Sequence, residues 1–146
     1  MSMSENRKEA FEIVYSLESQ NVNYEDYKEN VDMLLEEKGI HGRATTKFIK
    51  DIVYGTKRHG KQLKKQIESC LSEKWSYDRV SKINIVILEI AIFEMIYLKT
   101  PYKVAINEAV ELAKAYADAK APAFINGVLA SIVKKNNLDG GKVENE

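Results

Sequence analysis

Cysteine and histidine are scarce in this chain: Cys70 is the single cysteine in 146 residues, and His41 and His59 are the only histidines. A lone cysteine excludes an internal disulfide and any zinc cluster built from several cysteines. The two histidines are far apart in the sequence, and neither has an acidic residue at ligand spacing, so we expect no metal and no cofactor. No Ser-His-Asp arrangement is indicated either, and the sequence therefore favours a protein that is not an enzyme.

The chain also lacks a long hydrophobic run. Its most apolar segment, Ile83 to Leu98, is shorter than the roughly 20 residues that a bilayer span requires, and it contains Glu89 and Glu94. The N-terminus, MSMSENRKEAF, has no apolar run behind its basic pair and does not resemble a signal peptide. We therefore expect a cytoplasmic protein that makes no use of a membrane.

No overall excess of charge of one sign is present, because 22 basic residues balance 22 acidic ones. The charge totals therefore do not favour a histone-like or tail-type mode of binding nucleic acid. The charge is nevertheless unevenly distributed: residues 1–40 hold four Lys or Arg against ten Asp or Glu, whereas residues 41–65 hold eight against the single acid Asp51. The basic cluster from Lys57 to Lys65 could lie over phosphates or could simply be a solvated helix face, and charge alone leaves both readings open.

Apolar residues recur at helical spacing almost throughout, and no alternating segment with flanking turns predicts a sheet. The sequence thus predicts an all-α protein of about seven helices. We expect the long third helix to be interrupted near Gly55 or Gly60, since glycine weakens a helix. The expected helices cover residues of about 5–17, 24–37, 45–71, 83–98, 101–116 and from Pro122 onward.

The segment PYKVAINEAVELAKAY, residues 101–116, carries Asn107, Glu108, Glu111 and Lys114 on one face of its helix. Paired carboxylates that perform acid or base chemistry need burial or a charged partner to separate their pKa values, and this face offers neither a histidine nor a metal-ligand set. We interpret it as a solvated face with a Glu111–Lys114 pair. In FING, residues 124–127, the glycine favours close helix packing, and Phe124 is either a core residue or a ring that stacks on RNA beside Lys120.

Several blocks of the sequence, in this order, resemble the NusB family of transcription antitermination factors. The signature region is PYKVAINEAVELAKAY followed by FINGVLASI. Before it, Lys74, Trp75, Arg79 and Val80 fit a KW-x-x-x-R-V pattern, ILEIAIFEM resembles the family's core helix, and FIKDIVYGT resembles its third helix. The resemblance covers nearly the whole chain.

The resemblance implies one all-α domain over residues 1–136, made of two small helical subdomains at about 1–74 and 75–136. Residues 137–146 are polar and rich in glycine, so we expect a disordered tail there. The resemblance implies no catalysis. The family binds the boxA sequence of ribosomal RNA leader transcripts together with the ribosomal protein that acts as NusE, in a complex with RNA polymerase. By this resemblance we expect RNA binding at Arg7, Lys8, Lys120 and Phe124, and NusE binding at Tyr15 and Asn84.

The chain departs from the family pattern at its N-terminus, where relatives typically have several consecutive arginines and this chain has only Arg7 and Lys8. The electrostatic part of RNA affinity is therefore weaker or lies elsewhere.

Two alternative functions stay open at this point. One is the NusB-like domain of a ribosomal RNA cytosine methyltransferase. The chain shows no S-adenosylmethionine-binding βαβ segment, which argues against this alternative. The other is a homodimeric interaction module.

Overall fold

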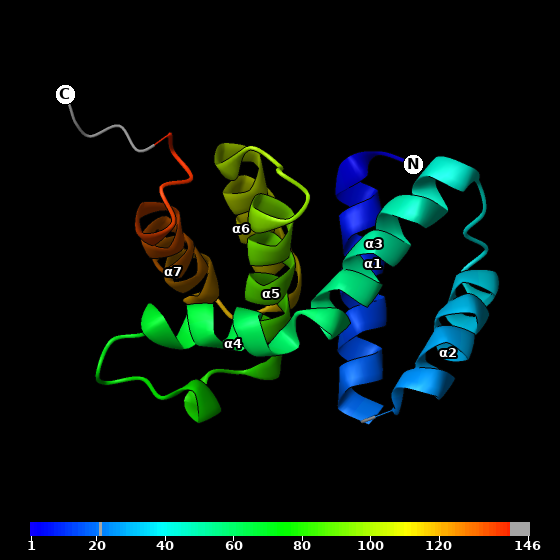
Figure 1. The fold of residues 1–146 in the computed structure, drawn as a ribbon, viewed down its shortest axis with the longest axis horizontal. Coiled ribbons are helices and arrows are strands. Elements are labelled where there is room, and N and C mark those ends of the chain that lie inside the picture. The colour runs from blue at the N-terminus through cyan, green and yellow to red at the C-terminus, as the bar shows by residue number, and fades with distance from the viewer. Residues whose placement is uncertain (21, 141–146) are drawn as a thin grey trace. The chain divides into compact units, whose positions relative to one another are not determined.

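The computed structural model describes residues 1–20 and 22–140, which form seven α-helices and one short 3-10 helix and include no β-strand (Figure 1). The all-α prediction is confirmed. None of the described helices is long and apolar enough to cross a bilayer. The chain divides into two compact units, an N-terminal unit, Met1–Arg58, and a C-terminal unit that begins at His59.

The N-terminal unit contains α1 (Met3–Gln20), α2 (Tyr24–Glu37) and α3 (Arg43–Arg58), and α1 packs against both of the others. Its core is formed by apolar residues at helical spacing, which include Phe11, Val14, Leu17, Val31 and Ile52. At the end of α2, Gly39 has a φ of 69°. The Ile40 amide then donates to the Leu35 carbonyl at 2.9 Å, the bond of a left-handed helix cap.

The C-terminal unit contains α4 (Gly60–Ser69), the 3-10 helix η1 (Tyr77–Arg79), α5 (Lys82–Ile96), α6 (Tyr102–Tyr116) and α7 (Ala121–Lys135). Helices α5, α6 and α7 pack against one another, and α4 contacts both α5 and α7. The segment from Ile85 to Met95 is buried on every side, as its nearly uninterrupted apolar sequence predicts. Two hydrogen bonds between the amides of Gln66 and Asn136, at 3.1 and 3.2 Å, connect α4 to α7.

The expected third helix is in fact two helices, because α3 ends at Arg58 and α4 begins at Gly60. Of the two glycines considered, Gly55 lies buried within α3 and the break occurs beside Gly60. The His59 ring between the two helices stacks on Tyr97 with centroids 4.0 Å apart and planes at 18°. Packing of His59, together with the low helix propensity of glycine, thus fixes the place of the break.

The exposed face of α6 agrees with its interpretation from sequence. Asn107, Glu111 and Lys114 are exposed, and the Lys114 ammonium lies 3.2 Å from the Glu111 carboxylate, which confirms the expected pair.

At the end of α7, residues 137–140 were expected to be disordered but form a hydrogen-bonded turn. Asn137 has a φ of 53°, and the Leu138 amide donates to the Val133 carbonyl at 3.0 Å. The rest of the expected tail, residues 141–146, lies outside the described residues.

Candidate functional site

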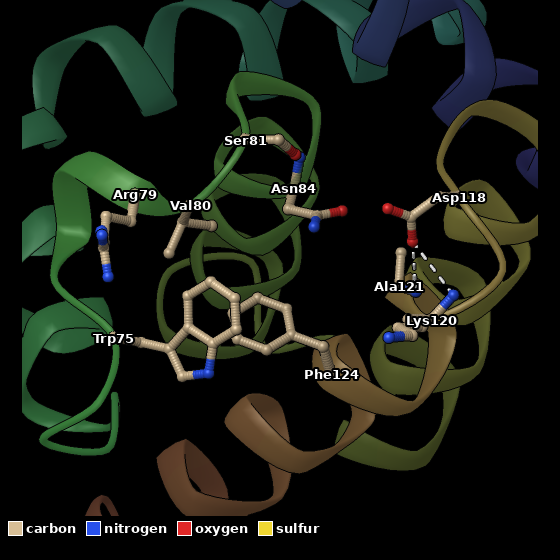
Figure 2. Close-up of a pocket in the computed structure, with 9 residues that line it drawn as sticks. All are labelled: Trp75, Arg79, Val80, Ser81, Asn84, Asp118, Lys120, Ala121 and Phe124. Carbon is tan, nitrogen blue, oxygen red and sulfur yellow. Dashed lines mark hydrogen bonds between the residues drawn. The ribbon is translucent and has the colours of Figure 1, made fainter.

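An open pocket of about 220 Å³ lies in the C-terminal unit, between η1 and the first turns of α5 and α7 (Figure 2). We call it the aromatic pocket. It combines two aromatic rings, two cations, one carboxylate and one amide. Its lining residues are Trp75, Arg79, Val80, Ser81, Asn84, Asp118, Lys120, Ala121 and Phe124.

Local helix caps hold the polar groups of the aromatic pocket in place. At the start of α5, the Ser81 hydroxyl accepts a hydrogen bond from the Asn84 backbone amide at 3.2 Å, which fixes Asn84 in the first turn. Before α7, one carboxylate oxygen of Asp118 accepts from the backbone amides of Lys120 and Ala121, both at 3.0 Å. The backbone on both sides of the pocket is therefore positioned before any ligand arrives.

The rings of Trp75 and Phe124 lie next to each other, with centroids 6.2 Å apart and planes tilted by 53°. Trp75 is unusually accessible for a tryptophan, since 50% of its surface is exposed. Phe124 is half-buried, which leaves part of its ring accessible to a ligand. Exposed aromatic faces beside cations are the features by which proteins bind unstacked nucleobases.

The side-chain carbonyl oxygen of Asn84 is buried and has no hydrogen-bond partner among the described residues. A buried acceptor without a partner costs free energy, on the order of 1 to 3 kcal/mol, unless a water or ligand satisfies it. Figure 2 shows the Asn84 amide above the two rings, with its oxygen directed toward Asp118. A rotation of this amide would let its oxygen accept a hydrogen bond from the edge of a base that stacks on the rings.

The aromatic pocket brings together three of the residues that the sequence singled out, Asn84, Lys120 and Phe124. Asn84 was expected at a protein interface, yet it shares this pocket with the two residues expected to bind RNA. Sequence reasoning did not assign Trp75 or Arg79 to a site. The available signal was an aromatic residue four positions before an arginine, in a short polar segment that forms no α-helix.

The other three residues singled out lie on α1 in the N-terminal unit. Arg7 is only 5% exposed, and its guanidinium carbon lies 5.4 Å from the centroid of the Phe48 ring, whereas Lys8 is exposed. Tyr15 is half-buried and stacks on Phe11 with centroids 6.0 Å apart. Lys8 and part of the Tyr15 ring are thus available to partners, while Arg7 is occupied by packing.

No metal centre is evident in the described part of the chain, where no group of three or more His, Cys, Asp or Glu residues is close enough to hold an ion. Several ion pairs connect the helices of the N-terminal unit. Lys38 bridges Glu9 and Glu12 of α1 at 2.8 and 2.6 Å, and Lys50 of α3 lies 3.0 Å from Asp32 of α2. The hydrogen bond to Asp32 raises the pKa of Lys50.

Residues 4–134 match the model of the NusB family. The transcription antitermination protein NusB of Lactiplantibacillus plantarum is 35% identical over 92% of this chain and 96% of its own length. That of Finegoldia magna has the same identity and coverage. A crystal structure of the antitermination factors NusB and NusE in complex with double-stranded RNA includes a chain that superposes with a TM-score of 0.80. The two chains are 30% identical, and the match covers 92% of the present chain and 99% of the chain in that crystal structure.

Proposed function

Because the chain belongs to the NusB family, we propose that it is a transcription antitermination factor that binds the boxA element of ribosomal RNA leader transcripts together with the ribosomal protein acting as NusE. The observation that carries the RNA part is the aromatic pocket, in which two accessible rings adjoin a buried amide acceptor and two cations. This combination suits a single-stranded base and its flanking phosphates. The factor performs no chemistry; it positions RNA and protein in an assembly that includes RNA polymerase in the cytoplasm.

Within the aromatic pocket we assign different tasks to different groups. The rings of Trp75 and Phe124 stack on a base, which supplies affinity with little dependence on its identity. Asn84 supplies the hydrogen bond that discriminates between bases. Arg79 and Lys120, both exposed, neutralise the flanking phosphates. Lys8 contributes a further phosphate contact from the N-terminal unit.

Tyr15 is proposed as part of the NusE interface. Its ring lies beside the inner stripe of α1 and is only half-buried, so that part of an aromatic face is offered to a partner. We expect Tyr15→Asp to weaken NusE binding at least about tenfold, or roughly 1.4 kcal/mol, since it places a charge in a desolvated contact. The melting temperature should change little, and a large drop would show instead that the ring is needed in the core.

Binding of boxA tests the whole proposal. Anisotropy titrations should show tighter binding of a boxA oligonucleotide than of a scrambled one, and the ribosomal protein should increase that difference. Gel filtration of the same mixtures should give a complex of one factor, one ribosomal protein and one RNA. Equal affinity for the two RNAs, with or without the ribosomal protein, would contradict the proposal. Self-association, which the resemblance also raised, would appear as a doubled mass of the protein alone.

A further inference from the structure

The N-terminal unit contains a second pocket, of about 200 Å³, which the proposed function does not use. It is lined by Tyr27 and Lys28 of α2 and by Tyr54 and Arg58 of α3, and we call it the basic pocket. The tyrosine rings form its wall, with centroids 6.4 Å apart, and Tyr27 is almost fully buried. Lys28 and Arg58 are exposed at its rim.

The cations at this rim are not neutralised by neighbouring carboxylates. Lys28 and Arg58 form no ion pair with any described residue. Asp32 lies one helical turn beyond Lys28, but it is already paired with Lys50 at 3.0 Å. The single acid of α3, Asp51, is paired with Lys47 at 2.7 Å. The lining of the pocket therefore holds two unpaired cations and no carboxylate, although α2 as a whole is acidic and Glu25 lies one turn before Lys28.

A third cation reinforces this charge. The ammonium of Lys57 lies 5.3 Å from the centroid of the Tyr27 ring, so it is held next to the pocket by a cation–π contact. Three positive charges thus gather around a concave surface with an aromatic wall. Such a surface attracts a polyanion and suits the phosphodiester backbone, which needs cations and tolerates an apolar wall beside the sugar.

The N-terminal segment itself cannot supply this charge. Of its two basic residues only Lys8 is exposed, because Arg7 is 5% exposed and packs on Phe48. We propose that the RNA backbone binds at the basic pocket, where Lys28 and Arg58 each neutralise a phosphate. This inference rests on the proposed function, since it concerns the same RNA, and it adds a contact that is independent of base identity.

The salt dependence of RNA affinity tests the inference. Each phosphate contact contributes about −0.7 to the slope of log affinity against log salt for single-stranded RNA. Lys28→Gln with Arg58→Gln should therefore flatten the slope by about 1.4, which reduces affinity about sevenfold more at 50 mM than at 200 mM salt. Lys57 is left unchanged because its contact with Tyr27 supports packing.

The matched control is Lys103→Gln with Lys134→Gln, which removes the same charge from exposed positions on α6 and α7. This control should leave the slope nearly unchanged. Equal flattening in both variants would mean that only net charge matters, and that would overturn the inference. As a second readout, boxA should shift the amide resonances of Lys28 and of residues 54–58 in the wild-type protein, and unshifted resonances would also overturn it.

A third variant separates failure of this inference from failure of the proposed function. Phe124→Ala, in the aromatic pocket, should lose boxA affinity in the same assay. If Phe124→Ala is impaired and the Lys28/Arg58 variant behaves as the wild type, the inference alone fails. If neither variant affects RNA binding, the proposed RNA function fails as well. If the Lys28/Arg58 variant weakens NusE binding but not RNA binding, the basic pocket is a protein interface and the inference is wrong.

Discussion

The aromatic pocket and the basic pocket differ in how firmly their polar groups are held. In the aromatic pocket, Asp118 accepts two backbone hydrogen bonds and the carbonyl of Asn84 is buried in the first turn of α5. In the basic pocket, the charged groups are the ends of long, exposed side chains without ion pairs. Fixed groups can discriminate between bases, whereas mobile cations bind any phosphate. The comparison assigns base specificity to the aromatic pocket, whereas both pockets contribute cations that bind phosphates.

The largest loss of RNA affinity is expected when one ring of the aromatic pocket is removed. Phe124→Ala or Trp75→Ala should each cost about 1 to 3 kcal/mol of boxA affinity if the ring stacks on a base. The salt slope should stay nearly unchanged, because no charge is removed. Anisotropy titrations at several salt concentrations measure both quantities. Trp75→Phe is the control, since it keeps an aromatic face and should retain most of the affinity.

The same titrations can contradict the assignment of base binding to the aromatic pocket. If Trp75→Ala flattens the salt slope as much as the Lys28/Arg58 variant does, then Trp75 does not act by stacking on a base. The RNA would then contact both regions through its backbone alone, and Asn84 would have no discriminating role.

The sequence predicted regular elements well where the chemistry is local. Helix α2 was placed at its observed residues 24–37, because Gly39 ends it with a backbone conformation that favours glycine. The end of α7 was less predictable, since Asn137 adopts the same conformation and keeps residues 137–140 in an ordered turn. The break at His59 depends on its packing against Tyr97, a contact across 38 positions that no local pattern reveals.

The candidate site was only partly predictable, because its residues come from two segments that are far apart in the sequence, 75–84 and 118–124. Lys120 and Phe124 were identified through the resemblance, but nothing in the sequence indicated that Asn84 shares their pocket. Arg7, by contrast, could have been recognised as buried. It lies three, four and seven positions before Ala10, Phe11 and Val14, and therefore on the apolar stripe of α1.

Arg7 and Lys8 provide the next prediction, because they are adjacent in sequence and differ in burial. Arg7→Ala should lower the free energy of unfolding by about 1 kcal/mol or more, since it removes a partly desolvated cation–π contact with Phe48. Lys8→Ala should leave stability unchanged and flatten the salt slope of RNA binding by about 0.7. Chemical denaturation and anisotropy titrations measure the two effects. The opposite assignment, a stable Arg7→Ala protein with a flattened slope, would return Arg7 to the RNA interface.

The smallest expected effect concerns Lys38, a cation that is paired, unlike those of the basic pocket. Burial alone would lower its pKa, but hydrogen bonds from the ammonium to Glu12 and Glu9 raise the pKa above its ordinary value of 10.5. A raised pKa in the folded state means that the stabilisation is fully present below pH 10.5 and is lost as the pH rises through the folded-state value. Because a quarter of the Lys38 side chain is exposed, we expect Lys38→Met to cost less than about 1 kcal/mol at neutral pH. The difference in the free energy of unfolding between Lys38→Met and the wild type should shrink above pH 10.5, and denaturation curves at pH 7 and pH 11 measure it.

Lys47→Met, which removes a more exposed pair with Asp51, is the control and should cost about 0.3 to 0.5 kcal/mol. A Lys38→Met protein as stable as the wild type at pH 7 would show that solvent screens this bridge, and that pairing is not what separates Lys38 from the cations of the basic pocket.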